Sequence, residues 1–191
     1  MNAAQMVKAL SEKFGESVTV NPEFRGEHSV TVKLESLKPL LRYCRDELGF
    51  DYLIDISSVD HNEQEPRFEM VYEAYGLGHR QHLRVKSLIS DDQEAPTVSD
   101  LWPTANWHER EVFDMMGIRF DGHPDLRRIL MWEGYPFHPL LKEFPLAGKP
   151  SEMPDVAFTG IAPLAGGPFV TSPSCGDTID REPHAKSFEG A

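Results

Sequence analysis

Within the first 90 residues, the spacing of apolar positions alternates between helical and strand periods. Apolar residues recur three or four positions apart over residues 3–14 and again over 36–48, which predicts two amphipathic helices. Apolar and polar residues alternate in five further segments, which predicts strands at 18–20, 29–34, 52–59, 68–75 and 81–89. The order α-β-β-α-β-β-β predicts an α+β fold, a two-layer sandwich with helices on one face of a mixed sheet.

Local signals predict where the second helix begins and ends. Ser36 is suited to cap its N-terminus, because a serine hydroxyl accepts a hydrogen bond from an unpaired first-turn amide. Pro39 then falls in the first turn, where its missing N–H costs little. Gly49 is expected to end the helix, since glycine readily adopts the left-handed conformation found there.

A third helix is predicted from about residue 104 to 116, ending at Gly117. At 100° per residue its apolar arc contains Ala105, Val112, Phe113, Met115 and Met116. The opposite side of the helix is expected to carry Trp107, Arg110, Glu111 and Asp114. Glu109 falls inside the apolar arc, and a carboxylate buried there needs a partner. Arg127 and Arg128 are the nearest strong candidates in sequence, so we expect one of them to pair with Glu109.

The chain divides into three parts: an α+β body over residues 1–90, a helical docking segment over 91–146, and a tail over 147–191. Twelve of the 45 tail residues are proline or glycine, so the tail cannot bury enough surface to fold alone. It nevertheless carries spaced apolar residues, namely Phe158, Ile161, Leu164, Phe169, Val170, Ile179 and Phe188. We interpret the tail as an extended strap that lies on a partner. The alternative is a disordered tail.

Composition narrows the classes of partner. The net charge of −12 disfavours nucleic acid and anionic lipid surfaces, since both require clustered Lys and Arg. No apolar run reaches the roughly 20 residues that span a bilayer, and the N-terminus lacks a signal or transit pattern. Membrane contact is therefore expected only through partners. Cys44 and Cys175 form no Cys-x-x-Cys pair, which disfavours an iron–sulfur or zinc site within this chain.

Candidate catalytic groups are few. His108-Glu109-Arg110-Glu111 lacks the second histidine of the zinc protease motif, and no glycine-rich phosphate loop is found. Asp121, His123, Asp125 and His138 could together ligate a metal. However, residues 122–125 read first as a turn fixed by Gly122 and Pro124. The density of charged, aromatic and proline residues over 106–146, without a complete catalytic set, is typical of a docking surface.

Within residues 101–146, several short motifs stand in one order. They are Glu109-Arg110-Glu111, Asp114, Gly117-Ile118, Phe120, Gly122-His123-Pro124, Leu126-Arg127-Arg128-Ile129-Leu130, His138-Pro139-Leu140, Lys142 and Phe144-Pro145-Leu146. This arrangement resembles the signature of the C subunit of NADH–quinone oxidoreductase, the member of respiratory complex I that adjoins its quinone-reducing D subunit. Residues 131–137 and Leu141 depart from the family pattern. We take the signature, with the neighbouring Trp107, as the candidate docking surface.

The resemblance implies a non-catalytic subunit with no cofactor, metal or catalytic residue of its own. NADH, flavin, iron–sulfur clusters and quinone would be used by the whole complex. The chain would support the hydrophilic arm against the D subunit, on the cytoplasmic side of the bacterial inner membrane. Related subunits occur in membrane-bound hydrogenase and formate hydrogenlyase complexes, which is one alternative. A stand-alone metal enzyme and an assembly factor of the same fold are the others.

Overall fold

The computed structural model describes residues 2–132 and 135–145. Its elements, in chain order, are α1 (Ala3–Phe14), a 3-10 turn (Gly15–Ser17), β1 (Val18–Val20), β2 (Ser29–Val32), α2 (Leu34–Asp46), β3 (Tyr52–Asp60), β4 (Phe68–Gly76), β5 (Gln81–Ile89), β6 (Ala95–Pro96), α3 (Ala105–Met116) and β7 (Phe120–Asp121). The predicted order of helices and strands through β5 is confirmed. Each predicted strand end lies within two residues of the observed one.

Five strands form one mixed sheet in the order β1-β2-β5-β4-β3. Strands β2 and β5 run parallel, and the other neighbours run antiparallel. The sheet is mixed because α2 connects β2 to the β3-β4-β5 meander. The connection through α2 allows β5, the last strand of the meander, to lie parallel to β2. Strands β6 and β7 form a separate parallel pair.

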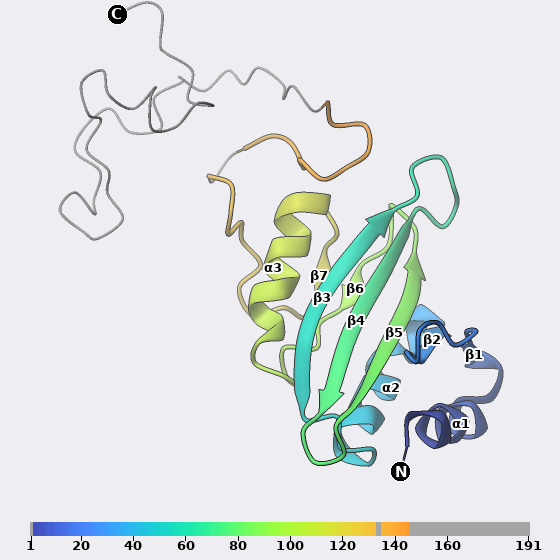
Figure 1. Ribbon diagram of the computed structural model, residues 1–191. Coiled ribbons are helices and arrows are strands. Elements are labelled where there is room, and N and C mark those ends of the chain that lie inside the picture. Colours follow the sequence, from blue (N-terminus) through green and yellow to red (C-terminus); the bar gives the residue numbers. More distant parts are fainter. Residues whose placement is uncertain (1, 133–134, 146–191) are drawn as a thin grey trace, which may run out of the picture. The chain divides into compact units, whose positions relative to one another are not determined.

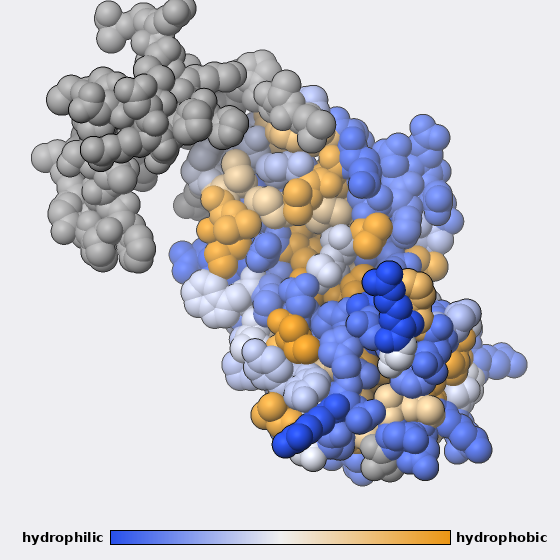
Figure 2. Space-filling model, in the orientation of Figure 1, coloured by the Kyte–Doolittle hydropathy of each residue, from blue (hydrophilic) through white to orange (hydrophobic). Residues whose placement is uncertain are grey.

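The two faces of the sheet differ sharply in chemistry. One face buries apolar side chains such as Val30, Met70, Tyr72 and Val85, and α2 lies behind it in Figure 1. The other face carries crossed ion pairs, including Lys86 with Glu69 at 2.7 Å and Arg84 with Glu73. Figure 2 views this open side and shows a mostly hydrophilic surface, with hydrophobic residues exposed over α3 and the chain after it. This arrangement confirms the predicted two-layer fold.

Helix α2 begins earlier than predicted. Lys33 is extended and precedes the first helical residue, and the Ser36 amide already bonds to the Lys33 carbonyl at 2.9 Å. Ser36 therefore lies inside the first turn and is not the cap, and Pro39 falls in the second turn. The early start places Leu34 against the hydrophobic core, a tertiary contact that outweighs the missing side-chain cap.

Helix α3 and the turns around it share the core of the body. Val98, Leu101, Trp102, Ala105 and Val112 are buried in the same cluster as the sheet residues. Gly117 ends the helix with φ of +80°, as predicted, and a side chain there would also meet the His138 ring at 3.0 Å. The described part of the docking segment therefore belongs to one compact unit with the body.

Candidate functional site

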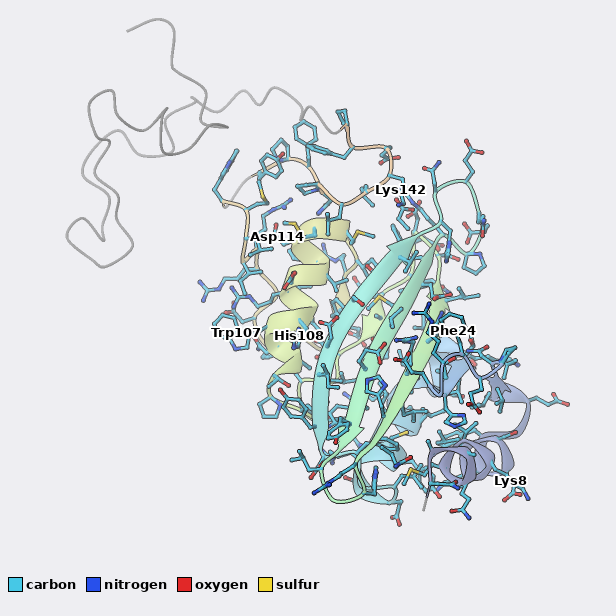
Figure 3. All side chains as sticks on the ribbon, in the orientation of Figure 1. Lys8, Phe24, Trp107, His108, Asp114 and Lys142 are labelled. Atoms are coloured by element: carbon cyan, nitrogen blue, oxygen red, sulfur yellow. The ribbon has the colours of Figure 1, made fainter. Side chains whose placement is uncertain are left out.

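Asp114, on α3, organises the chain that follows the helix. One of its carboxylate oxygens accepts three consecutive backbone N–H groups, from Ile129, Leu130 and Met131, at 2.7–3.0 Å. The other oxygen accepts the Arg128 guanidinium at 2.6 Å. The loop over residues 128–131 is thus wound around a single buried carboxylate, which lies at the C-terminal part of α3 in Figure 3.

Asp114 and Arg110, on the side of α3 opposite the predicted apolar arc, are both buried. A helical-wheel projection treats polar residues as outward-facing, but the following loop folds back over that side of α3. Burial alone would raise the pKa of Asp114. The amides of Met131, Ile129 and Leu130, with the Arg128 guanidinium, hold that pKa below its usual range. Arg110 donates to the carbonyls of Arg127 and Arg128 and so holds the same loop.

The prediction that Glu109 pairs with Arg127 or Arg128 is wrong. Glu109 is fully buried, as expected from the apolar arc, but it points toward the segment before the helix. Its carboxylate accepts the Thr97 hydroxyl at 2.6 Å and the Val98 amide at 2.7 Å. Arg128 bonds to Asp114 instead, and Arg127 forms an exposed pair with Asp125.

Glu109 retains a proton more readily than an ordinary glutamate. Burial raises its pKa to about 7, although the Thr97 and Val98 hydrogen bonds act in the opposite direction. The His123 ring lies 3.8 Å from this carboxylate, and both side chains are shielded from solvent. Glu109 therefore joins three pieces of the docking segment, namely the turn around Thr97, helix α3 and the turn that holds His123.

A third buried carboxylate, Asp60, holds the far end of the docking segment. Arg67 donates two hydrogen bonds to it, at 2.9 and 3.1 Å, and the Lys142 amide donates another at 2.8 Å. The Arg67 guanidinium, with the Lys142 and Asn62 amides, lowers the pKa of Asp60 against the opposing effect of burial. Figure 3 shows Lys142 beside the end of β3. Asp114 and Asp60 thus fasten the chain at 128–131 and at 142.

The surface that this arrangement presents is rich in aromatic and guanidinium groups. Trp107 is 60% exposed on the outer side of α3, where the Arg110 guanidinium lies 5.2 Å from its ring (Figure 3). A series of tilted and edge-on rings continues through Trp132, Tyr135, Phe137 and Phe144, with centroids 5.3–5.9 Å apart. Leu130 and Leu140 are exposed in the same segment. Tryptophan, tyrosine and arginine are the side chains most enriched at the energetic centres of protein interfaces.

The signature histidines serve two different networks. The Gly122–Asp125 turn forms as predicted, with Gly122 at φ +75° and Pro124 exposed. His123 faces the Asn106 carbonyl at 3.2 Å and accepts the Asp125 amide at 3.0 Å, whereas His138 faces the Asp114 carbonyl at 2.9 Å. Within residues 2–132 and 135–145, no three His, Cys, Asp or Glu side chains are grouped as a metal site.

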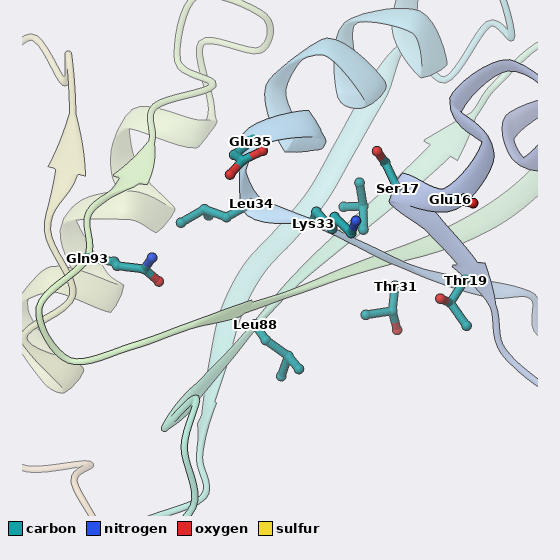
Figure 4. Close-up of a pocket in the computed structure, with 10 residues that line it drawn as sticks. Glu16, Ser17, Thr19, Thr31, Lys33, Leu34, Glu35, Leu88 and Gln93 are labelled. Carbon is teal, nitrogen blue, oxygen red and sulfur yellow. The ribbon is translucent and has the colours of Figure 1, made fainter.

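The hollows on the surface differ in how close they lie to the signature. One of about 380 Å³ is bordered by Glu16, Thr19, Thr31, Lys33 and Leu88, on the side of β1 and β2 (Figure 4). A smaller one of about 270 Å³ reaches Gly117 and His138 from the acidic loop over residues 91–94. The first hollow contains no signature residue, whereas the second is lined by Gly117, Ile118 and His138 of the signature.

Comparison with known proteins decides the family. Residues 30–150 match the family described as Respiratory-chain NADH dehydrogenase, 30 Kd subunit. The chain belongs to this family. The match begins within β2 and continues past α3, so it covers most of the sheet and the networks around Asp114 and Asp60.

Individual relatives agree with the family. The chain is 44% identical to the C subunit (number 2) of NADH-quinone oxidoreductase from Rhizobium meliloti (strain 1021), over 73% of this chain and 78% of the relative. It is also 44% identical to the NADH-quinone oxidoreductase C subunit of Geobacter sulfurreducens, over 75% of this chain and 90% of the relative. A protein in the archaeal membrane-bound sulfane sulfur reductase shares the fold, with a TM-score of 0.66 and 24% identity over 75% of this chain and 85% of that one. The chain is thus the C subunit of an NADH–quinone oxidoreductase-type complex.

Several functional residues could not be found from sequence spacing. Thr97 and Val98 lie 12 and 11 positions before Glu109, and Asp60 lies 82 before Lys142. The donors to Asp114 are mostly backbone amides, which every residue except proline carries. The sequence contains one signal for Asp60, which is its position on the apolar side of a predicted strand. A carboxylate at such a position requires a partner, as Glu109 does.

Proposed function

We propose that this chain is a non-catalytic structural subunit of a proton-translocating NADH:quinone oxidoreductase, and that it docks against the quinone-reducing D subunit. In this role it supports electron transfer from NADH to quinone in the whole complex without contacting either substrate. The observation that carries the proposal is the loop fastened by Asp114 and Asp60, since it presents Leu130 and a series of aromatic rings within a family signature, next to α3 with its exposed Trp107.

The chemistry of the signature supports a positioning role. Its carboxylates and guanidiniums form hydrogen bonds with one another and with backbone groups, and these bonds fix the conformation of the loop. Among the described residues, no helix has the length and apolar character needed to cross a bilayer. We propose that the chain reaches the membrane through its partner subunits, on the cytoplasmic side. Flavin, iron–sulfur clusters and quinone would be bound by those partners.

The purified chain is expected to bind neither NADH nor quinone and to show no oxidoreductase turnover. The reason is that the sequence has no nucleotide, flavin or cluster motif, and the described signature carboxylates and guanidiniums bond to one another and to backbone groups. Titration of the isolated chain with NADH and with a short-chain quinone, followed by fluorescence and calorimetry, measures this directly. A saturable binding curve, or a flavin absorption band that survives gel filtration, would contradict the non-catalytic assignment.

The tail is expected to contribute to the partner interface and not to the folding of the body. Residues 146–191 lie outside the described part of the chain, so this remains a prediction from sequence. A chain truncated after Gly148 keeps every described helix and strand and should retain the circular dichroism of the full chain. In a pull-down, it should recover less of the D subunit than the full chain recovers. Equal recovery would overturn the strap interpretation, and loss of folding would move the domain boundary.

A further inference from the structure

The hairpin that joins β1 to β2 ends in a tight tip. Phe24 and Glu27 exchange two backbone hydrogen bonds, at 3.2 and 2.9 Å, so only Arg25 and Gly26 form the loop between them. Both loop residues have positive φ, +54° and +80°. Positive φ at both positions is the mark of the type I′ turn, which fits the twist of a hairpin. The tip therefore presents Phe24 and Arg25 on a fixed backbone.

Polar contacts tie both arms of this hairpin to the sheet. On the β2 arm, the Glu27 carboxylate lies 3.1 Å from the Arg84 guanidinium of β5. The Arg84 amide also donates to the His28 carbonyl at 3.2 Å. On the β1 arm, the Asn21 amide donates to the Ser29 carbonyl at 3.0 Å. The hairpin is thus part of the sheet edge, and its tip holds its shape without help from a partner.

Arginine is an unfavourable residue at the first loop position of such a turn. The left-handed conformation brings its Cβ close to the following carbonyl oxygen, so glycine, asparagine or aspartate usually stands there. Within residues 2–132 and 135–145, Arg25 has no hydrogen bond or ion pair, and its guanidinium lies 5.2 Å from the Phe24 ring. The contacts within the fold do not explain this residue. Backbone strain of this kind points to a function outside the fold.

Phe24 is the most exposed large apolar side chain in the described part of the chain, at 66%. A single exposed apolar residue is ordinary on a protein surface. Phe24 differs because its ring lies beside a free guanidinium at the end of a hairpin. Aromatic rings and arginine are the side chains enriched in protein interfaces. Leu77, 63% exposed in the β4–β5 turn, belongs to a type that is under-represented among interface anchors.

The tip lies at the opposite edge of the sheet from the signature. The strand order places β1 and β2 at one edge and β3 at the other, where His108 of α3 pairs with Asp55 of β3. Figure 3 shows Phe24 and Trp107 on opposite sides of the sheet. The tip also precedes residue 30, where the family match begins. A contact made by the tip would therefore be separate from a contact made by the signature.

We propose that the Phe24–Arg25 tip anchors this chain to a second partner subunit, distinct from the D subunit. The inference rests on the proposed function, in which the signature faces the D subunit. The second partner offers an apolar pocket for the Phe24 ring. A carboxylate at the rim of that pocket binds the Arg25 guanidinium, which can donate two parallel hydrogen bonds to it. A second copy of this chain fits less well, because two chains of net charge −12 repel each other.

Substitutions at the tip separate binding from folding. Arg25→Asn removes the guanidinium but suits the left-handed conformation, so the isolated full chain should melt at the same or a higher temperature. The purified complex that carries Arg25→Asn should nevertheless retain several-fold less of the second partner subunit. Phe24→Ala should retain roughly tenfold less of it. Arg80→Asn is the matched control, because Arg80 also has a left-handed backbone, with φ of +55°, in the β4–β5 turn. Equal retention for Arg25→Asn and Arg80→Asn would contradict the anchor.

Photocrosslinking in the purified complex identifies the partner. A benzophenone analogue of phenylalanine replaces Phe24, Leu77 or Trp107, one at a time, and the adducts are mapped by mass spectrometry. Residue 24 should give one main adduct with a subunit other than D, in a segment that contains apolar residues and an aspartate or glutamate. Residue 107 should give an adduct with the D subunit. Residue 77 should give no main adduct, although it is about as exposed as residue 24.

The crosslinks distinguish this inference from the proposed function. Suppose that residue 107 reaches the D subunit, while residue 24 gives no adduct or reaches only D, a second copy or its own chain. The second anchor is then overturned and the proposed function stands. A main adduct from residue 77 as strong as that from residue 24 would also overturn the anchor, since exposure alone would explain both. If residue 24 reaches another subunit and residue 107 does not reach D, the anchor stands and the docking of the signature against D fails.

Discussion

Replacing Asp114 by alanine is expected to release the loop over residues 128–131 and to lower the free energy of unfolding by about 3–5 kcal/mol. The carboxylate accepts three backbone amides and one guanidinium in a buried position. Without it, these donors lose their acceptor, and each one that remains shielded from water costs about 1–3 kcal/mol. Urea unfolding of the isolated chain, followed by circular dichroism, measures the change.

The control for this experiment is Asp125→Ala. Asp125 is another carboxylate of the docking segment, but its pair with Arg127 is exposed on both sides. Exposed pairs contribute about 0–1 kcal/mol, so this variant should unfold close to the unsubstituted chain. Asp114→Asn should resemble Asp114→Ala. Asparagine replaces one carboxylate oxygen by an NH2 group, which cannot accept the hydrogen bonds that this oxygen accepts in the unsubstituted chain. Similar unfolding midpoints for Asp114→Ala and Asp125→Ala would refute the central role of Asp114.

Glu109 is expected to make stability fall as the pH rises from about 4.5 to 7. Its pKa in the folded chain is about 7, compared with 4.5 for an ordinary glutamate. Between these values the unfolded chain has lost the proton and the folded chain still holds it, so unfolding releases a proton and becomes easier at higher pH. The effect levels off above pH 7 and totals on the order of 3 kcal/mol.

Glu109→Gln isolates this contribution, because glutamine keeps the shape of the side chain and does not titrate. Free energies of unfolding measured between pH 4.5 and 8 should decline less for this variant than for the unsubstituted chain. Glu111→Gln, two positions along on the exposed side of α3, is the control and should follow the unsubstituted chain. If the curves for Glu109→Gln and the unsubstituted chain run parallel, Glu109 ionises normally and its buried environment does not set the pH dependence.

The elements of the body could be predicted from the sequence because their apolar periods are long and regular. Helix α1 and strand β5 were placed at the residues observed, and α3 to within one residue. The partners of Glu109 and Asp114 could not be predicted in this way. The position of a carboxylate within an apolar arc indicates that it is buried. It does not indicate the rotamer of the side chain, and so it does not identify the hydrogen-bond partners. Nearby arginines were the obvious partners for Glu109, yet a hydroxyl and an amide from the preceding turn occupy that place.

The side of α3 that carries Asp114 and Arg110 shows a second limit. Polar residues on one side of a helix usually face water, and here they face a loop that is not a helix or a strand and has no period of its own. The exposed positions Trp107 and Glu111, on the same predicted side, were placed correctly. Sequence alone therefore located the candidate surface but not the internal contacts that shape it.

The fastening of the loop by Asp114 and Asp60 has a consequence for how the surface can change over time. At residues 129–131 and 142 these carboxylates grip main-chain amides, which are chemically the same for every amino acid except proline. Substitutions between these two attachment points leave the backbone path of the loop intact, while they change the aromatic and charged side chains that the loop exposes. A lineage could therefore match this surface to a changing neighbour through residues 135–141, one replacement at a time, without rebuilding the scaffold underneath.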